Sequence, residues 1–207
     1  NNWTGPAGSH LVLRENYPKS NGQPGRYALR LPDGEMHFFD NNGNLDRIED
    51  RFGNAVDLGY VTMQANGVTV RRLSIAKNAA VHSAVIFEYN AQGQLITLHD
   101  CGSGGYDDET GSCSSSDHRK IRFEHSGDDL AAVVSPEVSG YPDGKRTSYT
   151  YLLGTGALGH KLKTITDGEQ NLPGAGDIPF ASIDYYETGS QSERVKTITY
   201  RGCEGQG

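Results

Sequence analysis

A twelve-residue pattern that occurs twice in the chain constrains its fold more than any other feature. The two copies are Phe39–Asp50 and Tyr89–Asp100. In both, an aromatic residue is followed by Asp or Asn, two residues, Gly, one residue, Leu, two residues, an aliphatic residue, one residue and Asp. This order is typical of a β-hairpin, in which the Asx side chain caps the turn and Gly adopts the left-handed conformation.

The hairpin interpretation gives each turn residue a role. The predicted turn residues of the two copies are Asp40, Gly43, Leu45, Asn90, Gly93 and Leu95. We expect both glycines to have positive φ, because glycine alone adopts that conformation cheaply. We expect each Leu to begin the return strand and to lie in the packed layer of the sheet with the preceding aromatic residue, Phe39 or Tyr89.

Three further segments keep parts of the pattern. His125–Val133 is one residue shorter before its Leu, Tyr151 is followed by a longer loop and then Leu162–Asp167, and Tyr185 is followed later by Val195–Ile198. Repeats of this size are typical of stacked supersecondary units, each of which buries a face only against its neighbours.

Short alternating segments and frequent turns fill the rest of the chain. Pro-Asp-Gly at 32–34 and at 142–144 separates such segments, since Pro sets φ and Gly accepts positive φ. Turn signals recur about every 8–12 residues. The one helical window, Ile75–Val81, is too short to indicate a helix. The sequence therefore predicts an all-β fold of antiparallel β-hairpin repeats in a curved, twisted sheet, with under about 10% helix.

Composition limits the organisation and the function classes. The chain has 207 residues, which is typical of one or two domains, and no clear linker divides it. We assign residues 1–26 to an irregular N-terminal segment and residues 27–207 to the repeat region, and we interpret the whole as part of a longer protein. The net charge of −7 argues against a nucleic-acid partner, which requires clustered Lys and Arg. No apolar run approaches the roughly 18 residues of a membrane span.

The cysteines point to an oxidising compartment. Cys101 and Cys113 flank the loop GSGGYDDETGS, and a disulfide between them would pin the base of this flexible insertion. The alternative is a pair of inert thiols in a reducing cytosol. We predict the disulfide, and with it a secreted or surface-exposed protein. Cys203 is left without a predicted partner.

Three other motifs are better explained by local structure than by a nucleotide-binding or metal-binding site. Gly154–Gly159 satisfies G-x-G-x-x-G, but β-like residues follow where a dinucleotide site needs a helix. Asp40–Asn44 resembles a calcium loop, but Leu45 and Arg51 stand where the EF-hand frame requires Gly and Glu. The acidic loop residues Asp107–Glu109, with Asp117, are interpreted as solvated carboxylates, with calcium binding as the alternative.

No sequence motif indicates catalysis. The seven histidines form no H-x-H or H-E-x-x-H pattern, and no G-x-S-x-G elbow is present. We therefore expect no enzymatic activity, no cofactor and no metal. The eleven tyrosines leave sugar stacking open, although tyrosines at period two more often pack on a sheet.

Several segments resemble the Rhs/YD-repeat family. Tyr89–Leu95 resembles the YD repeat, and Ile48–Asn54 resembles the segment that links Rhs repeats. Ile165–Asn171 resembles the same linking segment, with Gln170 in place of its glycine, and Tyr27–Tyr60 is the clearest match. The resemblance implies hairpins that wind into a hollow shell, as in Rhs proteins, Tc toxin components and teneurins, where the shell encloses a C-terminal toxin or serves surface recognition.

The sequence and the resemblance together predict a non-enzymatic structural segment of such a shell or scaffold. Its expected partners are neighbouring repeats or the C-terminal cargo of the parent protein. The alternative is an adhesin-like module that binds a glycan or a protein on another cell surface.

Overall fold

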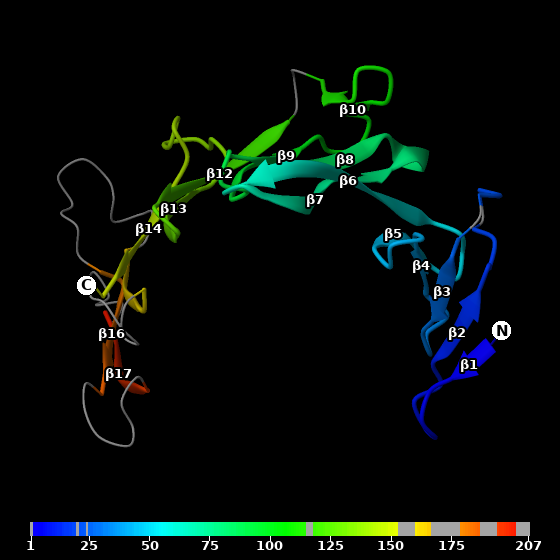
Figure 1. The fold of residues 1–207 in the computed structure, drawn as a ribbon. Helices are drawn as coiled ribbons and strands as arrows, with labels where there is room; N and C mark the ends of the chain where they lie inside the picture. Colours follow the sequence, from blue (N-terminus) through cyan, green and yellow to red (C-terminus); the bar gives the residue numbers. More distant parts are fainter. Residues whose placement is uncertain are drawn as a thin grey trace, which may run out of the picture. The chain divides into compact units, whose positions relative to one another are not determined.

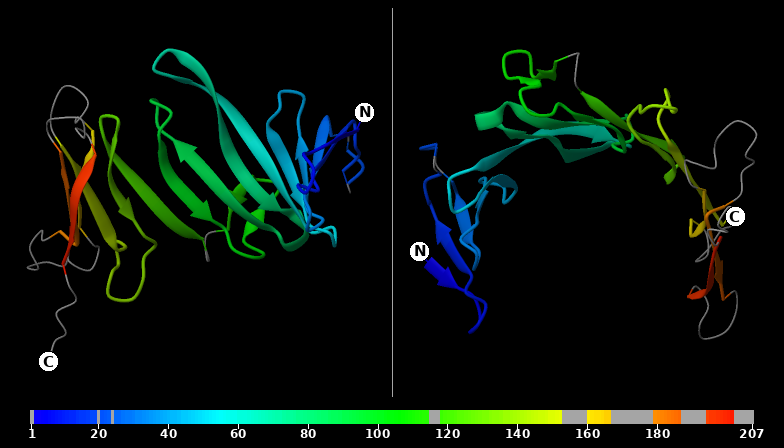
Figure 2. Two further views of the ribbon diagram at one scale, coloured as in Figure 1. Left: turned by 90° about the horizontal axis from the view of Figure 1, so that it is seen from below. Right: turned by 180° about the vertical axis from the view of Figure 1, so that it is seen from behind.

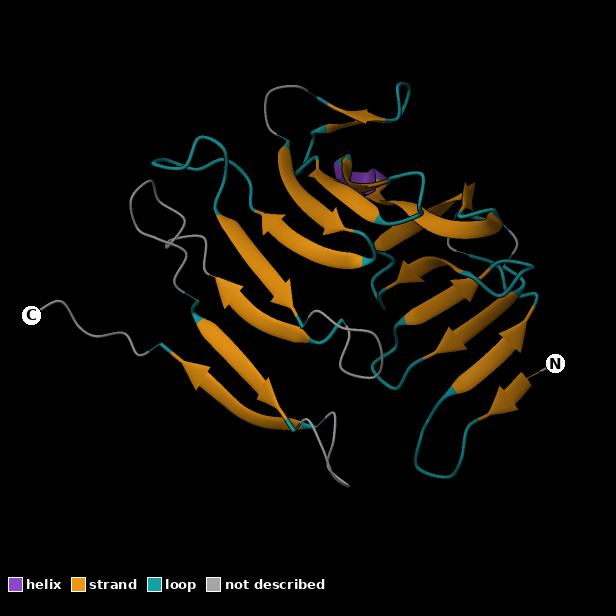
Figure 3. Cartoon of the chain, turned by 60° about the vertical axis from the view of Figure 1, so that its left-hand side comes forward, coloured by secondary structure: helices purple, strands orange, loops and turns teal. Residues whose placement is uncertain are grey.

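The computed structural model describes residues 2–19, 21–23, 25–114, 118–152, 160–166, 179–186 and 194–201. Strands form nearly all of the regular structure in these ranges, and every strand pair is antiparallel (Figure 3). The helical element described is one 3-10 turn, η1 (Ala79–Val81). The prediction of an all-β, antiparallel fold with little helix is confirmed.

The chain divides into two compact units, Asn1–Arg119 and Lys120–Gly207. In the described part of the first unit, nine strands pair in chain order (Figure 1). They are β1 (Asn2–Thr4), β2 (Val12–Glu15), β3 (Tyr27–Arg30), β4 (Met36–Phe39), β5 (Leu45–Glu49), β6 (Ala55–Ala65), β7 (Val68–Asn78), β8 (Ser83–Tyr89) and β9 (Leu95–Asp100). A separate small hairpin, β10 (Tyr106–Asp107) and β11 (Ser112–Cys113), follows β9.

The strands described in the second unit also pair in chain order (Figure 2). They are β12 (Arg119–Ser126), β13 (Asp129–Val134), β14 (Arg146–Tyr151), β15 (Leu162–Thr166), β16 (Ala181–Tyr185) and β17 (Val195–Tyr200). Each strand therefore pairs with its sequence neighbours, as expected for successive hairpins.

The first 26 residues differ from the sequence prediction, which made them irregular. They contain β1 and β2, and β2 pairs with β3 along its whole length. Strands of three and four residues offer too few alternating positions to be recognised from sequence between Gly- and Pro-containing turns. The window Ile75–Val81, which is too short to indicate a helix from the sequence, contains the end of β7 followed by η1.

A row of side chains crosses one face of the first sheet. Successive cross-strand partners in this row are Ala28, Phe38, Arg47, Asp57, Lys77 and Ala84. Phe38 is fully buried, and the ring of Tyr17, from the loop after β2, lies 6.3 Å from it. Burial in this sheet thus comes from loops and cross-strand neighbours that cover a single layer of strands.

Arg47, in the middle of the row, is buried together with Glu49, and its charge is paired. Nε of Arg47 donates to Glu49 at 2.6 Å, and Nη1 of Arg47 donates to Asp57 at 2.6 Å. Burial alone would lower the pKa of Arg47, but its hydrogen bonds to Asp57 and Glu49 raise it. Removal of one partner would leave an uncompensated buried charge, which is strongly destabilising.

Candidate functional site

The first predicted turn forms as the sequence indicates. Oδ1 of Asp40 accepts hydrogen bonds from the backbone N–H groups of Asn42 (2.8 Å) and Asn44 (2.9 Å). Gly43 has φ of 79°, and its N–H donates to the carbonyl of Asp40. Leu45 then begins β5. The Asx cap and the positive-φ glycine are confirmed at this hairpin.

The second predicted turn repeats this construction. Oδ1 of Asn90 accepts from the backbone N–H groups of Gln92 and Gln94, each at 3.0 Å. Gly93 has φ of 76°, and Leu95 begins β9. Since an amide replaces the carboxylate and Oδ1 accepts from the same two backbone positions, the turn requires an acceptor oxygen rather than a charge.

The segment between β5 and β6 forms a third turn of the same kind. Oδ1 of Asp50 accepts from Phe52 N–H at 2.8 Å and from Asn54 N–H at 2.9 Å, and Gly53 has φ of 88°. In the sequence pattern, Asp50 stands at the end of the repeat and has no predicted capping role. The spacing from Asp50 to Gly53 equals that from Asp40 to Gly43, which is the signal that identifies this turn.

Each repeated hairpin pairs its aromatic or histidine residue with an aliphatic residue across a β-bulge. In the two strong copies Phe39 faces Leu45 and Tyr89 faces Leu95, with a register shift directly before the aromatic residue. The three weaker copies give the pairs His125–Leu130, Tyr151–Leu162 and Tyr185–Val195, each with the same shift. The five hairpins therefore share one register as well as one sequence pattern.

The long hairpin of β6 and β7 is a further copy that the sequence pattern does not reveal. Tyr60 pairs with Leu73 after a register shift at Gly59, as in the other hairpins. The strands continue beyond this pair to a tip at Asn66 and Gly67, which have φ of 49° and 79°. Asn-Gly is the sequence signal for such a turn. The extra residues between Tyr60 and Leu73 break the spacing that defines the repeat.

Tyrosine hydroxyls join four of these hairpins to the hairpin before each of them. At four junctions the hydroxyl donates to the backbone carbonyl of the preceding hairpin's aliphatic residue, over 2.6 to 2.9 Å. The donor and acceptor pairs are Tyr60–Leu45, Tyr89–Leu73, Tyr151–Leu130 and Tyr185–Leu162. Burial raises the pKa of Tyr60, Tyr89 and Tyr151, so these hydroxyls remain donors.

Two consecutive arginines of β7 reach both predicted turns. Arg71 forms an ion pair with Asp40 at 2.9 Å, and its guanidinium lies 4.7 Å from the centre of the Tyr60 ring. Nε of Arg72 donates to the carbonyl of Gly93 at 3.3 Å. The long hairpin thereby connects the two turns, which are fifty residues apart in sequence (90 − 40).

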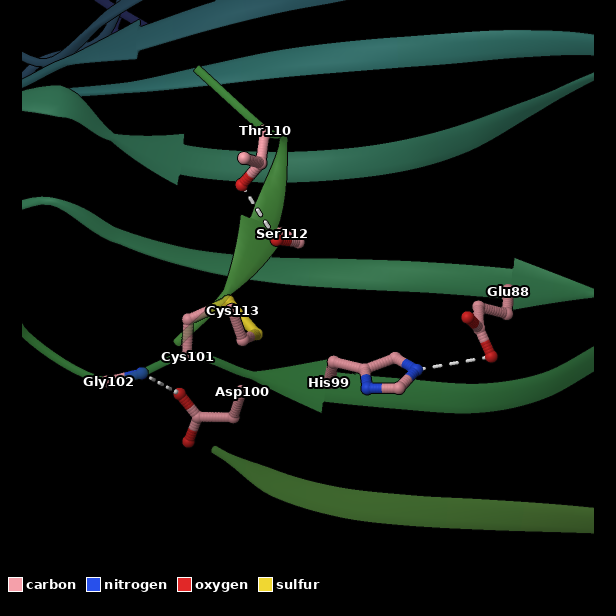
Figure 4. The surroundings of a disulfide bond; sticks show 8 residues. All are labelled: Glu88, His99, Asp100, Cys101, Gly102, Thr110, Ser112 and Cys113. Carbon is pink, nitrogen blue, oxygen red and sulfur yellow. Dashed lines mark hydrogen bonds and ion pairs between the residues drawn. A yellow bond between two sulfur atoms is a disulfide. The ribbon is translucent and has the colours of Figure 1, made fainter. Parts of the chain in front are cut away.

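The structure joins Cys101 and Cys113 in a disulfide, with their Cα atoms 4.9 Å apart (Figure 4). Cys101 is fully buried in a cluster with Ala84 and Tyr106. Partly buried apolar residues that pack against this cluster are Ile75, Ile86 and Cys113. The disulfide therefore anchors the inserted loop on the sheet beside β7 and β8.

The loop closed by this disulfide is more regular than the sequence suggested. It forms the hairpin of β10 and β11, and its backbone also bonds outside the loop. The N–H of Gly104 donates to the carbonyl of Val81 at 2.8 Å, and that of Tyr106 donates to His82 at 2.9 Å. A Cβ at Gly105 would lie 1.7 Å from the carbonyl oxygen of Cys101, so the close approach requires glycine there.

Two acidic residues of the loop, Asp107 and Asp108, have partners within the protein. Oδ1 of Asp107 accepts from the N–H of Glu109 at 2.9 Å, and Asp108 forms a 2.6 Å ion pair with Lys77. Two of the four carboxylates considered for calcium thus contribute to the turn and to loop docking. Asp117 lies outside the described residues.

A pocket of about 290 Å³ lies beside the disulfide. Its lining residues are Ile86, Glu88, His99, Gly111, Ser112, Cys113 and His118. The rings of His99 and His118 stack with centres 5.6 Å apart. Nε2 of His99 lies 3.1 Å from Oε2 of Glu88 (Figure 4). The two side chains are within ion-pair distance, but the contact does not have hydrogen-bond geometry. No sequence pattern indicates this grouping, because its residues come from four separate segments.

In the described ranges, no group of three or more His, Cys, Asp or Glu residues is arranged to hold a metal ion. The calcium-like segment that begins at Asp40 is accounted for by the turn described above. The G-x-G-x-x-G motif, Gly154–Gly159, and the third cysteine, Cys203, lie outside the described residues.

Comparison of the chain with protein-family models finds no match, and comparison with curated proteins finds none either. Among the residues that the structure describes, no helix is long and apolar enough to cross a membrane.

Proposed function

We propose that this chain is a non-enzymatic structural segment of an exported β-hairpin repeat protein of the Rhs/YD type, in which it forms part of an enclosing shell or scaffold. The observation that supports this most is the hairpin junction. Four junctions use the same donor, the same acceptor position and the same bulged register, although their sequences and loop lengths differ.

Such junctions suit a protein whose task is to extend a surface. Each hairpin is fixed by contacts to its neighbours, so stability is a sum of hairpin and junction contributions. Loops of different length are tolerated between junctions, as the long β6–β7 hairpin and the disulfide-anchored insertion illustrate. The tyrosine at each junction also corresponds to the aromatic residue of the Tyr-Asp repeat that the sequence resembles.

The disulfide supports the exported location. Disulfides persist in oxidising compartments such as the periplasm, the cell surface and the medium. Because Cys101 is buried and its loop packs on Ala84 and Tyr106, the bond belongs to the folded architecture of the first unit.

A glycan-array and nucleotide screen separates the scaffold from its alternatives. A scaffold segment should give array signals no higher than those of a Tyr200→Ala variant, in which an exposed aromatic side chain is removed. It should also show no thermal shift with ATP or NAD, since a ligand of the native state raises apparent stability. Saturable glycan binding that is lost in Tyr200→Ala would overturn the scaffold proposal in favour of an adhesin.

A further inference from the structure

The last described strand, β17, carries an open edge with exposed apolar side chains. It pairs with β16 on one side, and in the part of the chain that the structure describes no strand pairs with its other edge. Val195, Ile198 and Tyr200 are 49%, 45% and 62% exposed. Exposed edges with apolar side chains are templates for the addition of another strand.

The direction of the backbone groups on this edge follows from one hydrogen bond. The N–H of Arg201 donates to the carbonyl of Phe180, next to β16, at 2.9 Å. Backbone groups of an antiparallel strand alternate in direction, so those of Thr199 also point toward β16. Those of Ile198 and Tyr200 therefore point outward.

The four junctions obey one positional rule. The residue three positions after the aliphatic residue pairs with a residue on the next strand. The tyrosine of that next strand stands four positions after this pairing residue. The pairs are Ile48–Val56, Ala76–Val85, Val133–Thr147 and Ile165–Ala181, and the tyrosines are Tyr60, Tyr89, Tyr151 and Tyr185. The hydroxyl then reaches the carbonyl of the aliphatic residue itself.

The β17 edge presents the receiving half of the same junction. Val195 is the aliphatic partner of Tyr185 across the bulge, and Ile198 stands three positions after it. We propose that the outer edge of β17 is a strand-addition site for a β-hairpin whose first strand carries tyrosine four residues after the position opposite Ile198. The tyrosine hydroxyl donates to the carbonyl of Val195. This inference rests on the proposed scaffold function and adds the identity of the acceptor edge and the chemistry of its partner.

The four existing junctions define the chemistry of the incoming strand. The residue that pairs with Ile198 is small or β-branched. The residue two positions after it is apolar, and tyrosine stands four positions after it. The apolar residues at the middle position are Leu58, Phe87, Tyr149 and Ile183. The first strand of the chain, β1, reads Asn2-Trp3-Thr4 and offers no tyrosine, so a second copy that docks through β1 does not match.

The test joins a copy of Ser83–Asp100, the β8–β9 hairpin, to the last residue of the full chain through a flexible linker of about twenty Gly and Ser residues. Amide hydrogen exchange is followed at Ile198 and Tyr200, whose N–H groups point outward. The amides of Thr197 and Thr199, which point toward β16, report whether β17 remains folded. We expect exchange at Ile198 and Tyr200 to slow at least tenfold relative to the chain without the added hairpin.

Two variants of the added copy test the role of the tyrosine. Tyr89→Phe in that copy removes the hydroxyl and should reduce the protection roughly five- to tenfold, the value of one hydrogen bond. Thr97→Val removes a hydroxyl from the far strand of the same hairpin and should leave the protection unchanged. In the receiving chain, Ile198→Pro should abolish the protection of Tyr200 while Thr199 stays protected, since proline is tolerated where the N–H faces an open edge.

The outcomes separate this inference from the proposed function. If exchange at Ile198 and Tyr200 is unchanged while Thr199 stays protected, the strand-addition site is overturned. The proposed scaffold function is not affected by that result, and the tyrosine variants within the chain test it directly. Equal protection with the Phe copy shows pairing without the tyrosine rule and also overturns the proposal. Slower exchange that depends on the hydroxyl supports it.

Discussion

Single residues in the turns carry the strictest conformational requirements of this fold. Asp40 and Asn90 fill the same capping position with different chemistry, and both turns place glycine at positive φ. The spatial surroundings of the two glycines differ. Nothing lies within 4 Å of a Cβ built at Gly43, whereas a Cβ at Gly93 would lie 2.8 Å from Cβ of Ala65.

The first prediction compares alanine at these two glycines. Gly43→Ala should lower the free energy of unfolding by about 1–2 kcal/mol, because an L-residue is strained in the left-handed conformation. Gly93→Ala should cost more, since the same strain is joined by the contact with Ala65. Urea denaturation of both variants measures the difference. Equal losses would mean that the close approach of Ala65 to Gly93 does not exist in solution.

The second prediction concerns the charge of Asp40. Burial alone would raise the pKa of this carboxyl, but hydrogen bonds from Asn44 and Asn42 and the charge of Arg71 lower it below its ordinary value. A carboxyl with a lowered folded-state pKa adds stability above its unfolded pKa, and this stability is lost as the pH falls through the folded value. Asp40→Asn should therefore keep the turn, as Asn90 does, and reduce the loss of stability in acid.

Thermal midpoints of the Asp40→Asn variant and the parent chain, measured from neutral pH to about pH 3, check this. Asp128→Asn, at an exposed turn position, is the control and should leave the acid dependence of the parent intact. A parallel acid dependence in Asp40→Asn and the parent would contradict the prediction.

At the scale of the hairpin, the structure extends what the sequence pattern indicates. The spacing from Phe39 to Leu45 and from Tyr89 to Leu95 predicted the turns and the return strands. It did not reveal that the same aromatic position holds adjacent hairpins together, because the acceptor is a backbone carbonyl that no side-chain pattern marks. Tyr60 and Leu73 escaped detection for a related reason, since the long extension between them changes the spacing but preserves the register.

The third prediction removes one junction hydroxyl. Tyr151→Phe deletes the hydrogen bond to the carbonyl of Leu130 and should lower the free energy of unfolding of the second unit by about 1 kcal/mol. Tyr149→Phe, two residues earlier on β14, is the matched control, because its hydroxyl has no hydrogen-bond partner among the described residues. Denaturant titration of both variants should separate them. If Tyr149→Phe costs as much as Tyr151→Phe, the hydroxyl junction does not contribute to stability.

At the scale of the whole chain, the features that depend on local residue types were predicted from the sequence. The antiparallel hairpins, the turn glycines and the pairing of Cys101 with Cys113 follow from residue types and short spacings. The strands within residues 1–26 are too short to show an alternating pattern, and the grouping of Glu88, His99 and His118 brings together residues of separate segments. The sequence pattern does not reveal this grouping, because it depends on the strand pairing and on the fold of the inserted loop.

The fourth prediction concerns the disulfide and the inserted loop that it closes. Replacement of Cys101 and Cys113 by Ala should lower the free energy of unfolding of the first unit by up to about 3 kcal/mol, the loop-closure value for a loop of this size. The backbone bonds from Gly104 and Tyr106 to Val81 and His82 keep the loop docked in the folded protein, so the folded state gains little freedom without the disulfide and the loss should approach this value. Limited proteolysis should then cut within residues 102–112 before it cuts the strands.

Peptide mapping without reductant provides the decisive measurement for this disulfide. Protein purified under oxidising conditions should yield one linked peptide pair that contains both residues, and reduction should reproduce the proteolytic pattern of the double-alanine variant. The Cα separation of 4.9 Å lies within the range that a disulfide spans. Two free, alkylatable thiols in folded protein would contradict the bond and would remove the support that it gives to an exported location. Proteolysis confined to the loop in the variant would show that the insertion is docked on the sheet without being needed for the pairing of β8 with β9.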